Sequence, residues 1–509
     1  MKISLLILSF SLFFVSSCHN PSIEKPNILL ILVDDMGWSD IGCYGGEVAT
    51  PNLDRLAANG IRFTQMHNTS KCFPSRACLL TGVYAQQSGY DQSYKQPINH
   101  AVTLGEVLKT AGYRTLWSGK HHGIETPVDR GFDRYYGLRE GASNHFNPGP
   151  QREGEAKPAQ KRPDRPYFID HEKFQPYSPP KDFYTTDYFT KYALGWLEEY
   201  KEEDKPFFLY MAYTAPHDPL MAWPEDIAKY KGKYLEGYDG IRAKRYAKQK
   251  EMGLVNQSFL LSEETYDPWE SLSDSMKQVE DLKMAVYSAM IDHVDQKIGE
   301  ILNKIEELGK LDNTLVLFMS DNGSSAEVVN IPGDGNIGTV GQWTSLGKNW
   351  ANVSNTPFRY YKNYSFEGGI NTPLIACWPK GIEAKNAISR FPGHFIDIMP
   401  TLVEITGAKY PDQFNDQEII PMQGVSLWPV LQGKLVERGK PLFWQWQRGK
   451  AVREGKWKIV AHGENAPWEL YNMDEDPTET NNLARMHPEI VEKMDGLFLT
   501  WLNDSEKWK

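Results

Sequence analysis

Four short apolar runs along the chain each end in a cluster of polar residues. They span residues 28–33, 113–117, 207–213 and 315–319. Continuous apolar runs of this length are expected for strands that are buried on both faces. Helical patterns separate them, including a long amphipathic stretch over about 275–308 and a shorter one that begins at Thr50-Pro51 and ends at Gly60. This alternation predicts a mainly parallel sheet covered by helices.

Side chains capable of chemistry follow these four runs directly. They are the pair Asp34-Asp35, the run Lys120-His121-His122, His217 after Pro216, and the pair Asp321-Asn322. In open α/β sheets, ligands bind beyond the carboxyl ends of the strands. Because all four clusters fall at that edge, we expect them to converge on one active site.

Residues 72–82 read Cys-Phe-Pro-Ser-Arg-Ala-Cys-Leu-Leu-Thr-Gly. Pro74 suits the first turn of a helix and Thr81-Gly82 can end it, so Cys72 is predicted at a helix N-terminus. Free backbone N–H groups and the helix dipole favour an anion there. Arg76, one turn further along, can reach the same anion. The simpler interpretation is a buried cysteine at a turn before a helix.

The two acidic pairs are candidates for a metal site. Asp34, Asp35, Asp321 and Asn322 supply three carboxylates and one amide, an all-oxygen set that suits a hard cation such as Ca²⁺. Three carboxylates gathered at neighbouring strand ends would repel one another without a cation. The alternative is a set of solvated turn residues, since Asp and Asn are common in turns.

The segment that begins at Cys72 resembles the signature C-x-P-S-R-x-x-x-L-T-G of type I sulfatases. Further blocks similar to that family are residues 26–37, 50–54, 119–122, 216–217, 320–323, 362–369 and 470–477. The resemblance therefore extends over nearly the whole chain beyond its N-terminal segment. It implies an alkaline-phosphatase-like α/β/α sandwich with a large, mostly parallel mixed sheet, and a smaller C-terminal antiparallel sheet with a helix.

The resemblance also implies how the site works. A formylglycine-generating maturation enzyme would oxidise Cys72 to an aldehyde, whose hydrate attacks sulfur. One Ca²⁺ per chain would be held by residue 72 with Asp34, Asp35, Asp321 and Asn322. The residues implied around the sulfate are Arg76, Lys120, His217 and Lys362. His217, with Lys362, would protonate the departing oxygen, Asp321 would help to take the proton of the nucleophile, and His122 would deprotonate the remaining hydroxyl to restore the aldehyde.

Substrate choice is expected to lie in residues outside this cluster. The family usually has tryptophan at His121 and arginine at Asn371, so both positions are specificity candidates. Asn144 and His145 are two more, and so is the Gly-, Asn- and Ser-rich segment 324–355. For His121 an ordinary polar neighbour is the alternative. His293, between acidic residues in the long amphipathic stretch, is interpreted as structural.

The N-terminal segment indicates export. Met1-Lys2 and an apolar run over 3–15 lead into Val15-Ser16-Ser17-Cys18, which resembles a bacterial lipobox in which Cys18 is acylated. The alternative is an ordinary signal peptide cut near Ser17. The expected location is the periplasm, or the outer membrane or cell surface as a lipoprotein, with a lipid at Cys18 as the membrane anchor.

The expected organisation is a signal peptide over 1–17, a tether over 18–25, a catalytic domain over 26–415 and a C-terminal subdomain over 416–509. The Pro-rich segment 148–180 is expected to be an irregular surface insertion. A net charge of −11 disfavours a nucleic-acid partner.

Together these features predict a sulfatase that removes O-sulfate from carbohydrate. The alternatives are a phosphonate or phosphate ester hydrolase on the same scaffold, and a non-catalytic glycan-binding lipoprotein.

Overall fold

The computed structural model describes residues 24–508. The expected signal peptide, the lipid-bearing Cys18 and most of the tether lie outside these residues. Within the described part, no helix combines the length and apolar character that crossing a bilayer requires.

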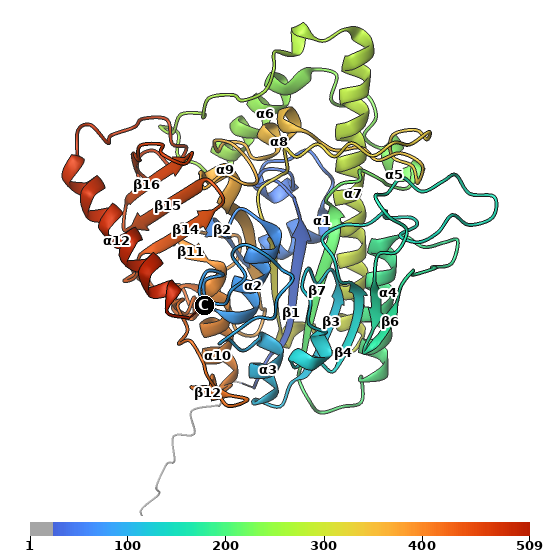
Figure 1. Cartoon of the computed structure of the whole chain (residues 1–509), viewed down its shortest axis with the longest axis horizontal. Coiled ribbons are helices and arrows are strands. Elements are labelled where there is room, and N and C mark those ends of the chain that lie inside the picture. Colours follow the sequence, from blue (N-terminus) through green and yellow to red (C-terminus); the bar gives the residue numbers. More distant parts are fainter. Residues whose placement is uncertain (1–23, 509) are drawn as a thin grey trace, which may run out of the picture.

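A large mixed sheet forms the centre of the molecule (Figure 1). Its strands are β1 (Asn27–Asp34), β2 (Ile61–His67), β3 (Arg114–Gly119), β4 (Arg134–Leu138), β5 (Tyr167–Ile169), β6 (Glu172–Phe174), β7 (Phe207–Pro216), β8 (Thr314–Ser320), β9 (Asn371–Cys377), β10 (Ala387–Ser389) and β11 (Gly393–His394). The order is β10-β2-β9-β8-β1-β7-β3-β4-β5-β6, with β11 also paired to β2. The central strands β8, β1, β7, β3 and β4 are mutually parallel, and β9, β5 and β6 supply the antiparallel pairings.

Helices cover both faces of this sheet. The α-helices of the described residues are α1 (Pro51–Ala58), α2 (Cys72–Thr81), α3 (Leu104–Lys109), α4 (Thr185–Glu199), α5 (Pro224–Ala228), α6 (Gly237–Glu251), α7 (Asp274–Glu307), α8 (Lys348–Ser354), α9 (Glu367–Ile370), α10 (Ile398–Thr406), α11 (Trp428–Leu431) and α12 (Pro488–Glu506). The predicted helices over 51–60, 72–82 and 275–308 correspond to α1, α2 and α7.

Successive residues of β1 enter two different hydrophobic cores, because side chains alternate along a strand. Ile28, Leu30 and Leu32 pack with residues of α2, α3 and α10. Leu29, Ile31 and Val33 pack with residues of α1, α4 and α7 on the opposite face. Full burial stabilises the fold by about 1.5–3 kcal/mol for each such side chain. Burial on both faces is why these strands are continuously apolar in the sequence.

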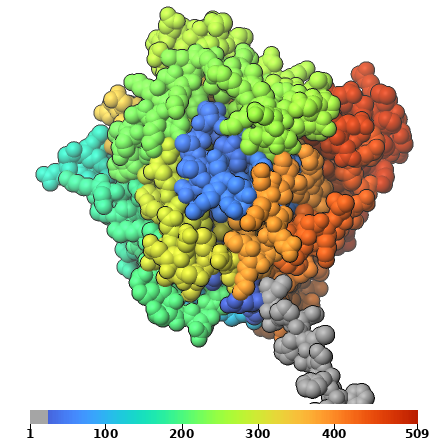
Figure 2. All heavy atoms as spheres, turned by 180° about the vertical axis from the view of Figure 1, so that it is seen from behind, coloured from blue at the N-terminus to red at the C-terminus, as the bar shows by residue number. Residues whose placement is uncertain are grey.

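A second, antiparallel sheet lies at one side of the molecule. Its strands are β14 (Leu442–Trp446), β15 (Gly449–Glu454), β16 (Trp457–His462) and β17 (Glu469–Asn472), and α12 packs against it. Figure 2 shows this C-terminal subdomain, coloured red, from behind. The mixed sheet with helices and the small C-terminal sheet confirm the predicted fold class.

A buried set of ion pairs joins this C-terminal subdomain to α9, which leads into the central strand β9. Lys458 Nζ lies 2.7 Å from carboxylate oxygens of both Glu367 in α9 and Glu479, and all three side chains are buried. Removal of one partner from such a buried set is strongly destabilising, because it leaves an uncompensated charge. The pairs therefore fix the C-terminal subdomain against α9.

Two predicted irregular segments contain regular structure. The segment 148–180 includes β5 and β6, which extend the sheet antiparallel beyond β4, so its prediction as wholly irregular was wrong. The segment 324–355 is mainly loop but ends in α8. A short hairpin of β12 (Gln413–Phe414) and β13 (Gln417–Glu418) spans the proposed domain boundary at 415/416, which stays a prediction.

Candidate active site

The carboxyl ends of four adjacent parallel strands gather the polar clusters. In the order β8-β1-β7-β3, Asp321 follows β8, Asp34 ends β1, His217 follows β7 and Lys120 follows β3. Asp35 takes a positive φ of 63°, which is uncommon for a residue with a side chain. The chain turns at the end of β1, and the carboxylates of Asp34 and Asp35 are both buried.

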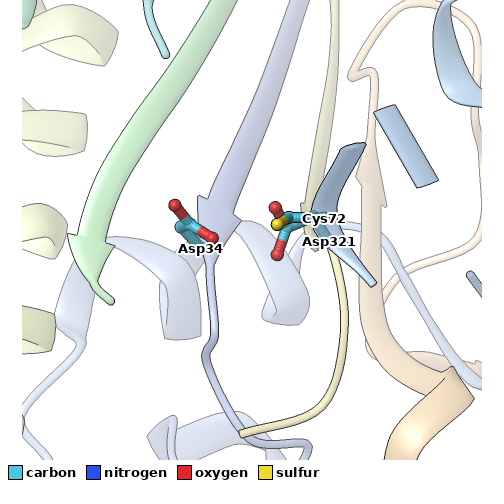
Figure 3. A group of neighbouring side chains, drawn as sticks. All are labelled: Asp34, Cys72 and Asp321. Carbon is cyan, nitrogen blue, oxygen red and sulfur yellow. The ribbon is translucent and has the colours of Figure 1, made fainter. Parts of the chain in front are cut away.

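Helix α2 places Cys72 in the same region. Cys72 is its first residue, and the helix ends at Gly82, whose φ of 73° suits glycine. The Cys72 sulfur and carboxylate oxygens of Asp34 and Asp321 all lie within 4.8 Å of one another. Figure 3 shows these three side chains beyond the carboxyl end of β1. The N-terminus of α2 therefore places Cys72 beside an acidic cluster, a name we use for Asp34, Asp35, Asp321 and the neighbouring Asn322.

The acidic cluster fits a hard divalent cation. Asp34 Oδ1 and Asn322 Oδ1 are buried oxygens without a hydrogen-bond partner, and an unpaired buried polar atom is costly. Asn322 Nδ2 donates to Asp35 Oδ1 at 2.6 Å, which brings the amide against the second carboxylate. Burial, together with the charge of Asp34, raises the pKa of Asp321 to about 6. Closely grouped oxygen ligands, two of them without a hydrogen-bond partner, are the chemistry that Ca²⁺ binds.

Three buried cations hold these carboxylates. Arg76 Nη2 lies 2.7 Å from Asp321 Oδ2, Lys120 Nζ lies 2.5 Å from Asp34 Oδ2, and Lys362 Nζ lies 2.8 Å from Asp35 Oδ1. Burial lowers the pKa of Lys362, but Asp35 and other negative groups outweigh it and raise that pKa well above its usual value. Lys362 is therefore charged, as a group that binds an anion must be.

His217 is the charged histidine of the site. Its Nδ1 lies 2.9 Å from Asp218 Oδ1 and its Nε2 lies 3.5 Å from Asp35 Oδ2. Burial lowers the pKa of His217, but the carboxylates of Asp35 and Asp34 outweigh it and raise that pKa to about 10. In this arrangement His217 carries a proton that it can donate.

His122 is its neutral counterpart. Burial lowers the pKa of His122 well below 6.5, and the positive charges of Lys120 and Arg76 lower it further. Its ring lies edge-on to Phe73 at 5.7 Å and to Tyr94 at 4.7 Å between centroids. A neutral imidazole can accept a proton, so the two histidines are suited to opposite tasks.

Of the four specificity candidates, Asn144, His145 and Asn371 are buried and His121 is half-buried. The His121 ring packs edge-on to Trp117 at 5.1 Å. Asn144 is buried and uses its whole amide, donating to the carbonyls of residues 159 and 340 and accepting from the N–H groups of 146 and 147. Asn371 Nδ2 donates to the Thr64 carbonyl and to Glu367. Asn144 therefore holds loops together and has no free polar atom for a sugar.

His145 supports the histidine that carries the proton. Burial lowers the pKa of His145 to about 4, so its ring is neutral. Nε2 lies 3.0 Å from the His217 carbonyl oxygen and Nδ1 lies 2.6 Å from Thr185 Oγ1. With its proton on Nε2, the ring donates to the carbonyl and accepts from the hydroxyl.

Three residues at the site were not found from the sequence. Asp218 pairs with His217, and Lys71 directly precedes Cys72, so adjacency to a candidate was the available signal. Glu327 pairs with Lys71 and Lys362, although 256 residues separate it from Lys71. It lies in the loop that follows Asn322, and its local sequence carries no motif.

Two protein-family models match most of the chain. Residues 26–408 match the model described as "Sulfatase", and residues 358–497 match "N-sulphoglucosamine sulphohydrolase, C-terminal". An uncharacterized sulfatase of Schizosaccharomyces pombe is 32% identical over 94% of this chain and 93% of its own. An arylsulfatase of Klebsiella aerogenes is 34% identical over 84% of this chain and 97% of its own.

A solved structure shares the architecture. The crystal structure of Ps i-CgsB in complex with k-i-k-neocarrahexaose superposes with a TM-score of 0.70 at 25% sequence identity. The match covers 95% of this chain and 94% of that one. The superposition therefore includes both the central sheet and the C-terminal subdomain.

Proposed function

This chain belongs to the sulfatase family and is a sulfuric ester hydrolase, as its resemblance to type I sulfatases predicted. On that premise we propose that its substrates are O-sulfated carbohydrates. The observation that carries the proposal is the group of four positive side chains, Arg76, Lys120, Lys362 and protonated His217, that surrounds the acidic residues beside Cys72. Support for a carbohydrate comes from the C-terminal match to an N-sulphoglucosamine sulphohydrolase model and from the oligosaccharide in the Ps i-CgsB complex.

Residue 72 is proposed as the nucleophile after conversion to formylglycine by a maturation enzyme. An unmodified thiol is a soft ligand and sits among hard oxygen ligands, whereas a hydrated aldehyde offers oxygen atoms to the same cluster. Asp34, Asp35, Asp321 and Asn322 would hold Ca²⁺, which when bound neutralises negative charge on the sulfate group.

The cations of the chain orient the ester. Arg76, Lys120 and Lys362 are buried, so their charges are weakly screened and favour the sulfuryl oxygens. His217 donates its proton to the departing alcohol oxygen. His122, held neutral and packed beside Phe73 and Tyr94, accepts the proton of the remaining hydroxyl of residue 72. The bond from that carbon to the sulfate oxygen then breaks, so that the aldehyde re-forms and sulfate leaves.

The test is hydrolysis of a small aryl sulfate and of a panel of defined sulfated mono- and disaccharides, with protein matured in the presence of the maturation enzyme. We expect turnover of sulfated sugars, and loss of about 10³-fold or more in Cys72→Ala. Cys78→Ala is the matched control, because Cys78 is a buried cysteine on the same helix. A higher kcat/KM for phosphate or phosphonate esters would contradict the proposal, as would binding of sulfated glycans without turnover.

Export as a lipoprotein is proposed from the N-terminal segment alone. Cys18→Ala should release the protein from the membrane fraction of the producing cell, because the lipid is the proposed anchor. Membrane association that persists in this variant would contradict lipidation at Cys18.

A further inference from the structure

One carboxylate of the site differs from the others in its exposure. Asp34, Asp35 and Asp321 are almost completely buried, whereas the Glu327 side chain is 40% exposed. It nevertheless contacts the buried centre, because Glu327 Oε2 lies 3.1 Å from Lys362 Nζ. Glu327 is thus placed between the sulfate-binding lysine and solvent.

Glu327 also reaches the residue beside the nucleophile. Its Oε1 accepts hydrogen bonds from Lys71 Nζ at 2.8 Å and from Asn363 Nδ2 at 3.1 Å. Lys71 directly precedes Cys72 and Asn363 directly follows Lys362. Lys71, Glu327 and Asn363 therefore form a partly exposed group beside Cys72 and Lys362, and we call them the rim residues.

The rim is held in place from two sides. Trp446 of the C-terminal sheet donates from Nε1 to Asn363 Oδ1 at 2.9 Å. On the other side the Val329 N–H donates to Ser345 Oγ, and Ser345 in turn donates to Asp218, the partner of His217. Glu327 is consequently a positioned group and not a freely moving surface carboxylate.

The carboxylate keeps capacity for one more donor. A carboxylate accepts about four hydrogen bonds, and Lys71, Asn363 and Lys362 provide three. Its exposed side faces the space outside the buried centre. Because Glu327 contacts Lys362 and is partly exposed, we place the alcohol half of a sulfate ester bound to Lys362 on that exposed side.

We propose that Glu327 is a specificity-determining residue, which accepts a hydrogen bond from a hydroxyl or ammonium group next to the sulfate ester and disfavours a second anionic group at that position. This inference rests on the proposed function. The inference extends the proposed function by naming the substrate class. These substrates are sugars that carry an uncharged or cationic hydrogen-bond donor, and no second sulfate or carboxylate, beside the ester that is cleaved. Like charges at short range repel, so a neighbouring sulfate would meet Glu327 unfavourably.

The test compares Glu327→Gln and Glu327→Ala with the wild type on three substrates. These are a small aryl sulfate, a monosulfated sugar with a free hydroxyl beside the ester, and the same sugar with sulfate on that neighbouring carbon. Asp334→Asn is the control, since Asp334 is an exposed carboxylate on the same loop.

For both Glu327 variants we expect kcat/KM on the aryl sulfate to stay within about threefold of the wild type. On the monosulfated sugar kcat/KM should fall about tenfold or more in Glu327→Ala and by less in Glu327→Gln, whose amide oxygen still accepts a hydrogen bond. In Glu327→Gln the ratio of activity on the disulfated to the monosulfated sugar should rise about tenfold. Asp334→Asn should change none of these values.

Equal losses on all three substrates would overturn the inference, because Glu327 would then merely support Lys71 and Lys362. Unchanged activity on all three would overturn it as well. Both results leave aryl sulfate turnover by the wild type intact, so they are distinguishable from failure of the proposed function, which would show as a wild type inactive on every sulfate ester.

Discussion

The Nε2 atom of His145 lies 3.0 Å from the backbone oxygen of His217, and this contact fixes the turn that carries the proton donor. His217 follows β7 directly, and its backbone N–H donates to the Thr214 carbonyl at 3.1 Å. The hydroxyl of Thr185, at the start of α4, holds the other ring nitrogen of His145. His145 is thereby a positioning residue for the proton donor.

We predict that His145→Ala lowers kcat by roughly 2- to 12-fold, the equivalent of one hydrogen bond. The loss should be greater for sugar sulfates than for activated aryl sulfates, because only the poorer leaving group depends on a donated proton. His217→Ala should show the same dependence at about 10²–10⁴-fold. The test is to measure kcat for a series of aryl sulfates whose leaving groups differ in pKa, and to compare how strongly kcat depends on that pKa in each variant and in the wild type. An equal loss on all leaving groups in both variants would contradict the donor role of His217.

Ca²⁺ binding should stabilise the folded chain. At a hundredfold excess over its Kd, the ion should raise the free energy of unfolding by about 2.7 kcal/mol. Asp34→Ala should remove this increase, because Asp34 Oδ1 is, with Asn322 Oδ1, one of two buried oxygens among the proposed ligands that have no hydrogen-bond partner. Thermal unfolding with and without chelator tests the effect, and metal analysis identifies the ion. Stoichiometric zinc without calcium would contradict the argument from hard ligands.

His293 lies outside the site and should make stability depend on pH. Its Nδ1 lies 2.8 Å from Asp226 and its Nε2 lies 2.6 Å from Asp187. Burial lowers the pKa of His293, but the hydrogen bonds to Asp187 and Asp226 outweigh it and raise that pKa from 6.5 to about 9. A raised folded-state pKa stabilises fully below 6.5, and this contribution is lost as the pH rises through about 9.

His293→Gln should therefore destabilise the protein by about 2–3 kcal/mol at pH 6, with a smaller difference above pH 9. Thermal midpoints measured at both pH values test this. His171→Gln is the matched control, because His171 is an exposed histidine that lies 3.6 Å from Asp129. The same pH dependence in both variants would show that the Asp187–His293–Asp226 contacts are not its origin.

Local pattern in the sequence was sufficient for the central strands β1, β3, β7 and β8, for α2 and for the convergence of strand ends, but not for β5 and β6. Buried parallel strands leave continuous apolar runs, and Pro74 and Gly82 mark a helix that begins at Cys72. The roles of Asn144 and Glu327 could not be read in this way. Asn144 is defined by the carbonyl of residue 340, and Glu327 by lysines at 71 and 362. Such contacts depend on how loops distant in sequence meet in the fold.

The central claim is that residue 72, once converted to formylglycine, is the nucleophile. Peptide mass spectrometry of preparations matured to different extents measures the fraction in which residue 72 has lost its sulfur, and the same preparations are assayed for sulfate ester hydrolysis. The account predicts that activity rises in proportion to the formylglycine fraction while Cys78 remains a cysteine. Full activity in protein that carries only cysteine at position 72 would contradict it.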